Sequence, residues 1–366
     1  MKKIGLITFH RVYNYGAVIQ AYAMQQVLKN EGYDCVIIDF SKRKQLDFTN
    51  VISTRNGFKR FVKTLMMLPI YSKRNERKRK FDHFIGDKLI LTKKTYESES
   101  TMEDMENDFD VFLVGSDQVW NVRKESDTSE AYFLSFVHDK KKVSYASSIG
   151  ISNERDLRRY KSELEGFSHI SCREKGGAAE LAKLLGIEVP VVLDPTLLAT
   201  RDLYDKVSGI KCDGDYILYY TLHGKDKCNE NMEVLCELKK KFNLKLKIIA
   251  PEWPYHKEFG EDVIDAGPED FLSLIKNAAL VCTTSFHGTA LSLEFEKPFF
   301  VLENRNINDE RKRSILEQVG AMDRIISSVE EVRNISSYKM NYENVSKRLS
   351  ELRKQSKDYL IKALQR

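Results

Sequence analysis

The chain has 366 residues and a formal net charge of +5, from 59 Lys and Arg against 54 Asp and Glu. This length favours two domains, and a content of 42% hydrophobic and 31% charged residues excludes a largely disordered chain. So mild a charge gives no indication of a nucleic-acid partner, and none is expected. It fits an anionic small substrate or a loose approach to a membrane surface.

The N-terminal sequence MKKIGLITFH carries two lysines before a short apolar stretch. The stretch is too short for the apolar core of a secretory signal, so it predicts a buried strand and a cytoplasmic protein. No apolar run approaches the roughly 18 residues that a membrane span requires. The cysteines form no C-x-x-C pair and are expected to be reduced core thiols. They are Cys35, Cys172, Cys212, Cys228, Cys236 and Cys282.

Short apolar runs alternate with amphipathic stretches along the first part of the chain. Strands are predicted at 3–9, 35–40, 111–115, 143–146, 169–172 and 191–193, and a helix at 17–30. The basic run at 73–80 is predicted to be the solvated face of a helix that buries Phe81 and Phe84. The alternative is a patch that faces an anionic polymer or lipid head group at the inner face of a membrane.

A second series of the same kind follows the stretch 200–215, which has few apolar residues. Strands are predicted at 216–221, 244–250, 280–283 and 299–302, and helices at 229–242, 268–277 and 289–296. Continuous apolar strands indicate parallel sheets covered on both faces. The expected fold is α/β, with two Rossmann-like domains facing a cleft. Their limits are 1–205 and 206–335, followed by a C-terminal amphipathic helix at 336–366.

Ligands of such sheets bind beyond the carboxyl ends of the strands, so polar residues there are candidates. After the first strand, Asn14 can cap the next helix, and Tyr15 and Gly16 allow backbone amides to approach an anion. An ordinary polar turn is the alternative. The loop 115–121 is rich in hydrogen-bonding groups and holds a Trp, which suits a sugar; the alternative is a buried Trp with a capping Asp. Its candidates are Ser116, Asp117, Gln118, Trp120 and Asn121.

Three further strand ends carry charged or titratable groups. Arg173 can clamp a carboxylate or phosphate, or form a salt bridge to Glu174 or to a neighbouring helix. Asp194 most simply caps the turn before Pro195. His287 follows the strand at 280–283 at the start of a helix, where a neutral imidazole suits proton transfer.

The turn around His287 and the segment after the strand at 299–302 complete the set of candidates. Gly288 is expected to leave room for a substrate, and the alternative for His287 itself is a satisfied core histidine. One of Arg305, Arg311 and Arg313 is expected to face the cleft.

Five stretches, in chain order, resemble those of the polysaccharide pyruvyl transferase family, in its SFHG-type bacterial branch. They are NYGAVIQAYA at 14–23, GSDQVWN at 115–121, SYASSIG at 144–150, SCREK at 171–175 with DPT at 194–196, and SFHGTA at 285–290 with KPF at 297–299. The resemblance implies a GT-B-like fold. It also implies transfer of a pyruvyl group from phosphoenolpyruvate to two hydroxyls of a saccharide or lipid-linked oligosaccharide, in capsule, exopolysaccharide or cell-wall polymer synthesis.

In better-studied members of that family an arginine that holds the donor stands two residues before the histidine, where this chain has Ser285. Arg173 and Arg313 are the candidate replacements, with amides at Ser285 and Gly288 as further donors. A GT-B-like glycosyltransferase using a nucleotide sugar is the alternative enzyme, and a non-catalytic binding subunit is a third possibility. No metal-binding motif is present in the sequence, so a reaction independent of metal and cofactor is expected.

Overall fold

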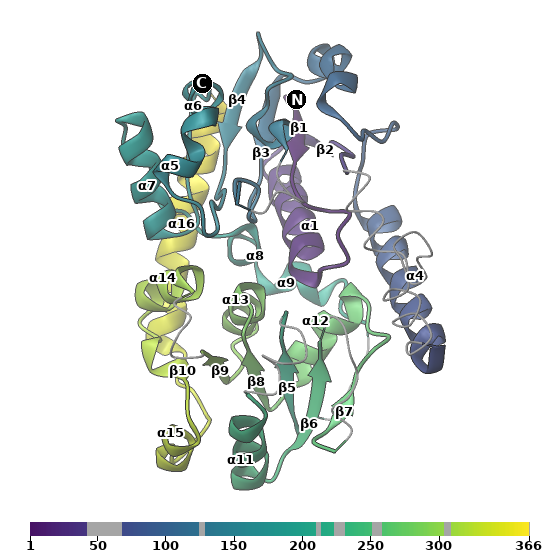
Figure 1. Cartoon of the computed structure of the whole chain (residues 1–366), viewed down its shortest axis with the longest axis vertical. Coiled ribbons are helices and arrows are strands. Elements are labelled where there is room, and N and C mark those ends of the chain that lie inside the picture. The colour runs from purple at the N-terminus through teal and green to yellow at the C-terminus, as the bar shows by residue number, and fades with distance from the viewer. Residues whose placement is uncertain are drawn as a thin grey trace. The chain divides into compact units, whose positions relative to one another are not determined.

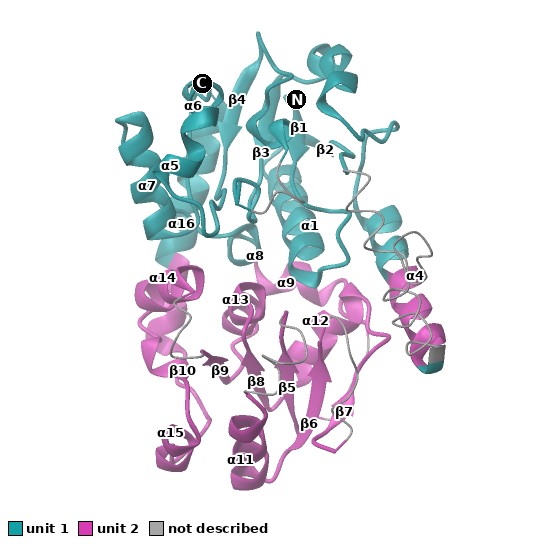
Figure 2. Cartoon of the chain, in the orientation of Figure 1, with its two compact units in different colours: residues 1–69, 81–199, 351–366 teal, residues 70–80, 200–350 magenta. Residues whose placement is uncertain are grey.

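The computed structural model describes residues 1–41, 68–123, 129–209, 214–222, 231–250, 258–303 and 309–365 (Figure 1). It has two compact units, coloured separately in Figure 2. The first comprises Met1–Pro69, Phe81–Ala199 and Glu351–Arg366, and the second comprises Ile70–Lys80 and Thr200–Ser350. Two helices, α4 (Tyr71–Lys88) and α16 (Glu343–Gln365), contribute residues to both units. That residues 1–205 and 206–335 form independent domains stays a prediction.

The first unit is built on a parallel sheet with the strand order β2-β1-β3-β4. Its strands are β1 (Lys3–Ile7), β2 (Asp34–Ile37), β3 (Val111–Val114) and β4 (Lys141–Ser144). All four residues of β3 are buried, as expected for a central strand with both faces covered. The predicted βαβ opening is confirmed, with α1 (Tyr15–Asn30) between β1 and β2.

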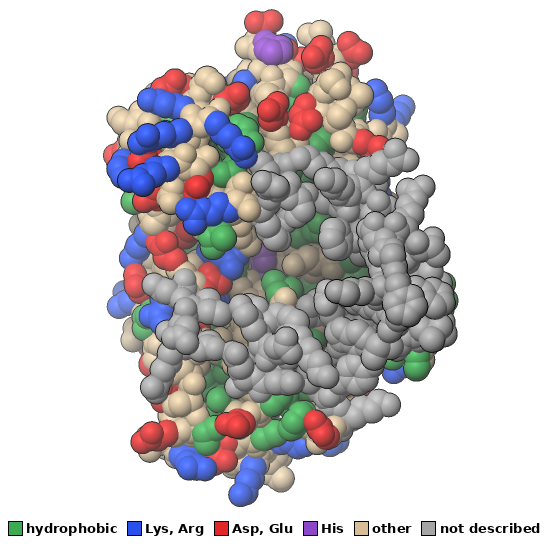
Figure 3. Space-filling view, viewed as in Figure 1, with side chains coloured by type: hydrophobic (Ala, Val, Ile, Leu, Met, Phe, Trp, Pro, Cys, Tyr) green, Lys and Arg blue, Asp and Glu red, His purple; other side chains and the backbone are tan. Residues whose placement is uncertain are grey.

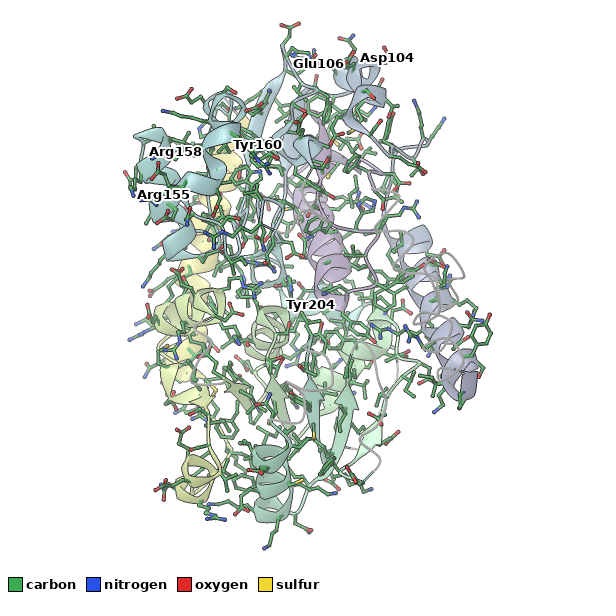
Figure 4. All side chains as sticks on the ribbon, in the orientation of Figure 1. Asp104, Glu106, Arg155, Arg158, Tyr160 and Tyr204 are labelled. Carbon is green, nitrogen blue, oxygen red and sulfur yellow. The ribbon has the colours of Figure 1, made fainter. Side chains whose placement is uncertain are left out.

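The helices of this unit are short apart from α1, α4, α7 and α16. They include α5 (Glu154–Leu157), α6 (Lys161–Glu165), α7 (Lys175–Leu185) and α8 (Pro195–Leu198). Several 3-10 turns join them, among them η3 (Glu103–Asp108), η4 (Glu130–Phe133) and η5 (Arg158–Tyr160). Tyr160, labelled in Figure 4, stacks on Phe133 with ring centroids 3.9 Å apart. Glu106, also labelled, accepts hydrogen bonds from the successive backbone amides of residues 138–140 ahead of β4.

The strands predicted at 169–172 and 191–193 are wrong as continuous strands. Both segments extend the sheet beyond β4 only through isolated bridges, such as Val143 to His169 and Cys172 to Val191. The amide of Cys172 donates to the carbonyl of Pro190, and Val192 donates back to Cys172. Because Pro190 has no N–H group, this ladder cannot continue in the N-terminal direction.

The second unit holds a six-stranded parallel sheet in the order β10-β9-β8-β5-β6-β7. Its strands are β5 (Tyr216–Tyr220), β6 (Lys245–Ile249), β7 (Glu261–Asp262), β8 (Leu280–Thr283), β9 (Phe299–Leu302) and β10 (Ile325–Ile326). The sequence analysis missed β7 and β10, which have two residues each. Such short edge strands bury too little apolar surface to leave a pattern in the sequence.

The helices of the second unit include α9 (Arg201–Asp205), α11 (Met232–Phe242), α12 (Pro268–Asn277), α13 (Phe286–Glu294), α14 (Glu310–Val319) and α15 (Val329–Asn334). Helices α11, α12, α13 and α14 lie between strands of this sheet along the chain, as parallel connections require, whereas α9 precedes β5 and α15 follows β10. The helix predicted at 268–277 is confirmed, with Pro268 in its first turn. The start predicted at residue 289 is wrong, because α13 begins at Phe286 and takes Gly288 into its first turn.

The basic run on α4 is partly covered rather than fully solvated. Phe81 and Phe84 are buried as predicted, and within the run only Lys73 and Arg79 are exposed basic residues. Lys80 pairs with Asp270 at 2.7 Å. None of the helices in the described ranges is long and apolar enough to cross a membrane.

The prediction of reduced core thiols holds for three of the cysteines. Cys35, Cys172 and Cys282 are buried and free, and Cys236 is free and half-buried. Burial raises the pKa of all four thiols, so they are poor nucleophiles. Cys212 and Cys228 lie outside the described residues.

Candidate active site

In the second unit, the loops after β5 and β8 meet where the strand order reverses. Along the chain, β5 is followed by β6 on one side of it, whereas β8 lies on its other side. Thr221 after β5 and Thr284 after β8 are joined through their hydroxyls at 2.9 Å. Open parallel sheets bind ligands at such a reversal, beyond the carboxyl ends of their strands. The segment that leads into α13 is therefore the strongest candidate for an active site in this unit.

His287 lies in the first turn of α13, directly after this loop. The residue is 6% exposed, and its ring meets the Phe286 ring edge-on with centroids 5.3 Å apart. The first turn of a helix presents backbone N–H groups that have no partner within the helix, together with the positive end of the helix dipole. An imidazole in this place can exchange a proton with an anionic ligand bound there.

Ser285 is the N-cap residue of α13, yet its hydroxyl does not bond to the amides of the helix. The residue is 3% exposed, and the hydroxyl has no hydrogen-bond partner within the described ranges. Its backbone is well held, because its amide donates to Thr283 Oγ1 at 3.0 Å and its carbonyl accepts from the amide and hydroxyl of Thr289. Buried hydroxyls without a partner are uncommon, so this one can serve a ligand.

Gly288 has a different role from the one expected, since the space beside its Cα is already filled. A Cβ there would lie 2.4 Å from Thr283 Oγ1 and 3.0 Å from Tyr220 Cδ1. The missing side chain lets α13 pack directly against β8 and β5. Packing of the helix, and not room for a substrate, explains the glycine.

A group of charged residues that the sequence analysis mostly missed lies beside the same turn. Lys312 on α14 is 3% exposed, and its Nζ donates to the carbonyl of Thr284 at 3.1 Å. Burial lowers the pKa of Lys312, while Asp309 and Glu303 oppose that shift. The signal was available in the sequence. Lys312 precedes the buried Ile315, Leu316 and Val319 by three, four and seven residues, which places it on the buried face of α14.

Arg313, the predicted anion ligand of this region, is already paired. Its guanidinium bonds to Glu303 Oε2 at 2.8 Å. Arg311 pairs in the same way with Asp309 at 2.7 Å. The third arginine considered for this role, Arg305, lies outside the described residues.

In the first unit, the strand order reverses between β1 and β3. Thr8, after β1, donates from its hydroxyl to the carbonyl of Ser116, after β3, at 2.9 Å. Gln20 on α1 donates in turn to the Thr8 hydroxyl. The predicted loop 115–121 therefore lies at the reversal of this sheet, in the place where a ligand is expected.

Arg173 lies in a buried network of three carboxylates. Its guanidinium is 2.8 Å from Asp194, 3.7 Å from Glu174 and 4.0 Å from Asp117. Burial alone would lower the pKa of Arg173, but these three carboxylates raise it, so the residue stays charged. Asp194 also accepts from the Ser116 hydroxyl and caps α8, as predicted. Among the described residues, these ion pairs join one guanidinium to three carboxylates.

Asp117, Gln118 and Asn121 form the rest of the loop. Asp117 has a φ of 78°, in the left-handed region that is rare outside glycine. Asn121 donates to Gln118 at 3.0 Å, and a Cβ on Gly150 would lie 2.4 Å from Asn121 Nδ2. The two amide side chains thus pack tightly on the turn at Gly150. Strained backbone of this kind occurs most often at functional sites.

Trp120 lies in the hydrophobic core of the first unit. The residue is 0% exposed, its indole N–H donates to the carbonyl of Tyr132, and its ring stacks on Phe133. Trp120 therefore agrees with the alternative prediction, a buried Trp, and not with a sugar-binding surface. The indole ring anchors the loop 115–121 to the hydrophobic core, and neither of its faces is accessible to a sugar.

Asn14, Tyr15 and Gly16 are brought together at the start of α1. Asn14 caps the helix, accepting from the amide of Ala17 at 3.3 Å, which confirms the predicted cap. Tyr15 and Gly16 are buried, and the Tyr15 ring packs against Phe81 at a centroid distance of 5.0 Å. These residues form the first turn of α1, and whether its amides bind an anion stays a prediction.

Solved structures of UDP-N-acetylglucosamine 2-epimerases, one of them putative, resemble this fold. UDP-N-acetylglucosamine 2-epimerase from Rickettsia bellii shares 12% identity, covers 100% of this chain and 96% of its own, and has a TM-score of 0.54. The Neisseria meningitidis enzyme bound to UDP-GlcNAc is 12% identical, with 100% of this chain and 99% of that enzyme covered and a TM-score of 0.52. A putative UDP-N-acetylglucosamine 2-epimerase from Listeria monocytogenes is 15% identical, with 98% of this chain and 90% of that protein covered and a TM-score of 0.51. At these identities the likeness shows the fold alone, which is GT-B-like as predicted.

Comparison of the sequence with protein families identifies the family to which the chain belongs. The family model for polysaccharide pyruvyl transferase matches residues 14–306. No curated protein is significantly similar in sequence. The match spans both candidate loops and α13, and the chain belongs to the polysaccharide pyruvyl transferase family. It is therefore a transferase, as the five sequence stretches predicted.

Proposed function

We propose that this enzyme transfers a pyruvyl group from phosphoenolpyruvate to two hydroxyls of a saccharide, forming a ketal. The polymer served is proposed to be a capsule, exopolysaccharide or cell-wall polysaccharide. The single observation that carries the proposal is the place of His287, in the first turn of α13 at the reversal of the second unit's sheet. There a proton donor and a helix start stand next to each other, which suits a donor with both a phosphate and a carboxylate.

In the proposed reaction, His287 delivers a proton to the methylene carbon of phosphoenolpyruvate. The carbon that carries the phosphate becomes cationic, and one saccharide hydroxyl adds to it and loses its proton. The bond between this carbon and the phosphate oxygen then breaks, and phosphate leaves. A second hydroxyl adds to the same carbon and closes the ketal; of the two protons that the hydroxyls release, one restores His287 and the other leaves with the phosphate.

The saccharide is assigned to the first unit. Asp117, Gln118 and Asn121 offer a carboxylate and two amides at the reversal of that sheet, and groups of this kind bind hydroxyls. Saccharide hydroxyls are neutral and add no charge to the buried ion pairs of Arg173 next to this loop. Ser116 is held by Asp194 at 2.6 Å and fixes the start of this loop.

The test is phosphate release from phosphoenolpyruvate with lipid-linked or nucleotide-linked oligosaccharides as acceptors. His287→Asn is expected to lower the rate by about 10²–10⁴-fold, the usual contribution of a general acid, while the affinity for phosphoenolpyruvate stays. His83→Asn, which changes a largely exposed histidine on α4, is the matched control. If the wild-type enzyme neither turns over with any acceptor nor binds phosphoenolpyruvate by calorimetry, the proposal fails. Binding of a nucleotide sugar instead would favour a glycosyltransferase.

A lipid-linked acceptor would bring the enzyme to a membrane, and we assign that contact to a basic surface of the first unit. Figure 3 shows Lys and Arg side chains gathered over α5, α6 and α7. Arg155 and Arg158, labelled in Figure 4, belong to it, and Ile151, four positions before Arg155 in the chain, is 70% exposed. Co-sedimentation with anionic vesicles at low salt should be reduced in Arg155→Glu. The absence of wild-type binding would refute this contact.

A further inference from the structure

Lys312 is a buried cation directly behind the candidate catalytic turn. Its Nζ donates to the carbonyl of Thr284, the residue before Ser285, at 3.1 Å. Lysine is among the residues least often buried, because removing an ammonium group from water costs several kcal/mol unless an opposite charge compensates it. Something in the second unit must therefore stabilise this charge.

The neighbouring carboxylates compensate it only in part. Glu303 and Asp309 lie 3.7 Å and 3.8 Å from Lys312 Nζ, beyond hydrogen-bond distance. Each makes its closer ion pair with an arginine, Arg313 or Arg311, at 2.8 Å and 2.7 Å. Three cations face two carboxylates, so the group has a formal charge of 3 − 2 = +1. An anion bound nearby would balance it.

Ser285 supplies an independent sign of a ligand at the same place. Its hydroxyl is buried, stands at the N-cap of the nine-residue helix α13 and does not cap it. The described residues offer that hydroxyl no hydrogen-bond partner. A ligand oxygen would satisfy it and would also face the positive end of the helix dipole.

We propose that Lys312, together with the Ser285 hydroxyl, holds an anionic group of the donor at the start of α13, in place of the arginine expected there. This inference rests on the proposed function for the identity of the donor. It replaces the earlier candidates, since Arg313 is paired with Glu303 at 2.8 Å and Arg173 is paired with Asp194 at 2.8 Å. The excess positive charge of the described group around Lys312 favours a phosphate or carboxylate there.

The experiment measures affinity by calorimetry, with phosphoenolpyruvate and inorganic phosphate as probes. Lys312→Gln removes the charge but leaves a donor for the Thr284 carbonyl, so a purely structural role predicts little change. We expect a loss of about 10- to 100-fold, the range of one charge-assisted hydrogen bond, and near wild-type affinity for Lys312→Arg. Lys297→Met is the matched control, because it removes a half-buried lysine beyond the other end of α13.

Ser285→Ala keeps the test decisive if the lysine variants do not fold. Its hydroxyl has no partner to lose among the described residues, so the melting temperature should stay while affinity falls about threefold to tenfold. Wild-type affinity in folded Lys312→Gln, or in Ser285→Ala, overturns the inference. If the wild-type enzyme binds phosphate through Lys312 but not phosphoenolpyruvate, the proposed donor is wrong and the anion site stands. If it binds neither probe, both proposals fail.

Discussion

Gly288→Ala tests whether close packing of α13 on the sheet places the candidate catalytic turn. A Cβ at this position would lie 2.4 Å from Thr283 Oγ1, 3.0 Å from Thr283 Cβ and 3.0 Å from Tyr220 Cδ1. The Thr283 hydroxyl cannot simply turn away, because it donates to the Tyr220 carbonyl at 2.8 Å and accepts from the Ser285 amide. Either α13 shifts or these bonds break.

The magnitude follows from two opposing effects. Glycine to alanine in a helix gains about 0.5–1 kcal/mol, whereas one methyl group too many in a filled site costs about 1–3 kcal/mol. Gly86→Ala on α4 isolates the first effect, because nothing lies within 4 Å of its added Cβ. The two variants should therefore differ by about 1–3 kcal/mol in local stability, the packing cost alone.

Hydrogen exchange is the suitable assay, because a chain of two compact units need not unfold in one step. Amides of α13 should exchange faster in Gly288→Ala, and amides of α4 should exchange more slowly in Gly86→Ala. In a Thr283→Ala background, the Oγ1 contact is absent and the cost at position 288 should shrink. The packing argument is refuted if Gly288→Ala protects α13 as Gly86→Ala protects α4.

Two further predictions concern charges in the first unit. Burial alone would raise the pKa of Asp39, but hydrogen bonds from Arg11, His10 and Thr95 hold it well below its usual value. This stabilises the fold at neutral pH and is lost as the pH falls through the lowered pKa. Asp39→Asn should therefore lower the free energy of unfolding by about 1–3 kcal/mol at pH 7 and by less below about pH 4; equal losses in urea titrations at both pH values would contradict this. Arg173→Met should cost about 3–5 kcal/mol by leaving buried carboxylates without their cation, and Arg173→Lys less. A Met variant with the wild-type urea midpoint would show that the network is not stabilising.

The sequence predicted the parts of the fold that depend on local pattern. The strands 280–283 and 299–302 agree with β8 and β9, because a short continuous apolar run between turn residues favours a buried strand over a helix. The motif around His287 was also placed correctly, after a strand and at a helix start. These features need only neighbouring residues to be recognised.

What could not be predicted depends on partners distant in the sequence. Arg173 was expected to clamp an anion, yet its charge is already shared with Asp117 and Asp194, which lie 56 and 21 positions away. Trp120 was expected to face a sugar, but it packs on Phe133 in the core. The spacing of Lys312 on α14 could indicate its burial, but its contact with the Thr284 carbonyl, 28 positions away, could not be predicted. For each of these three side chains, its partners in the fold determine what it does, and tertiary packing decides which partners it has.

The division of α16 between the two units has a consequence for biosynthesis. Residues from 351 onward belong to the first unit, where Ser356 accepts from the amide of Leu193 and Arg353 donates to the carbonyl of Leu197. Lys2 donates to the last carbonyls of the same helix. A ribosome adds about 5–20 residues per second. The first unit must therefore wait roughly 10–30 s after residue 199 leaves the peptidyl transferase centre before its last helix exists. During that interval the nascent chain exposes the apolar surface that Leu360, Ala363 and Leu364 of α16 later cover, and such surface is prone to aggregation.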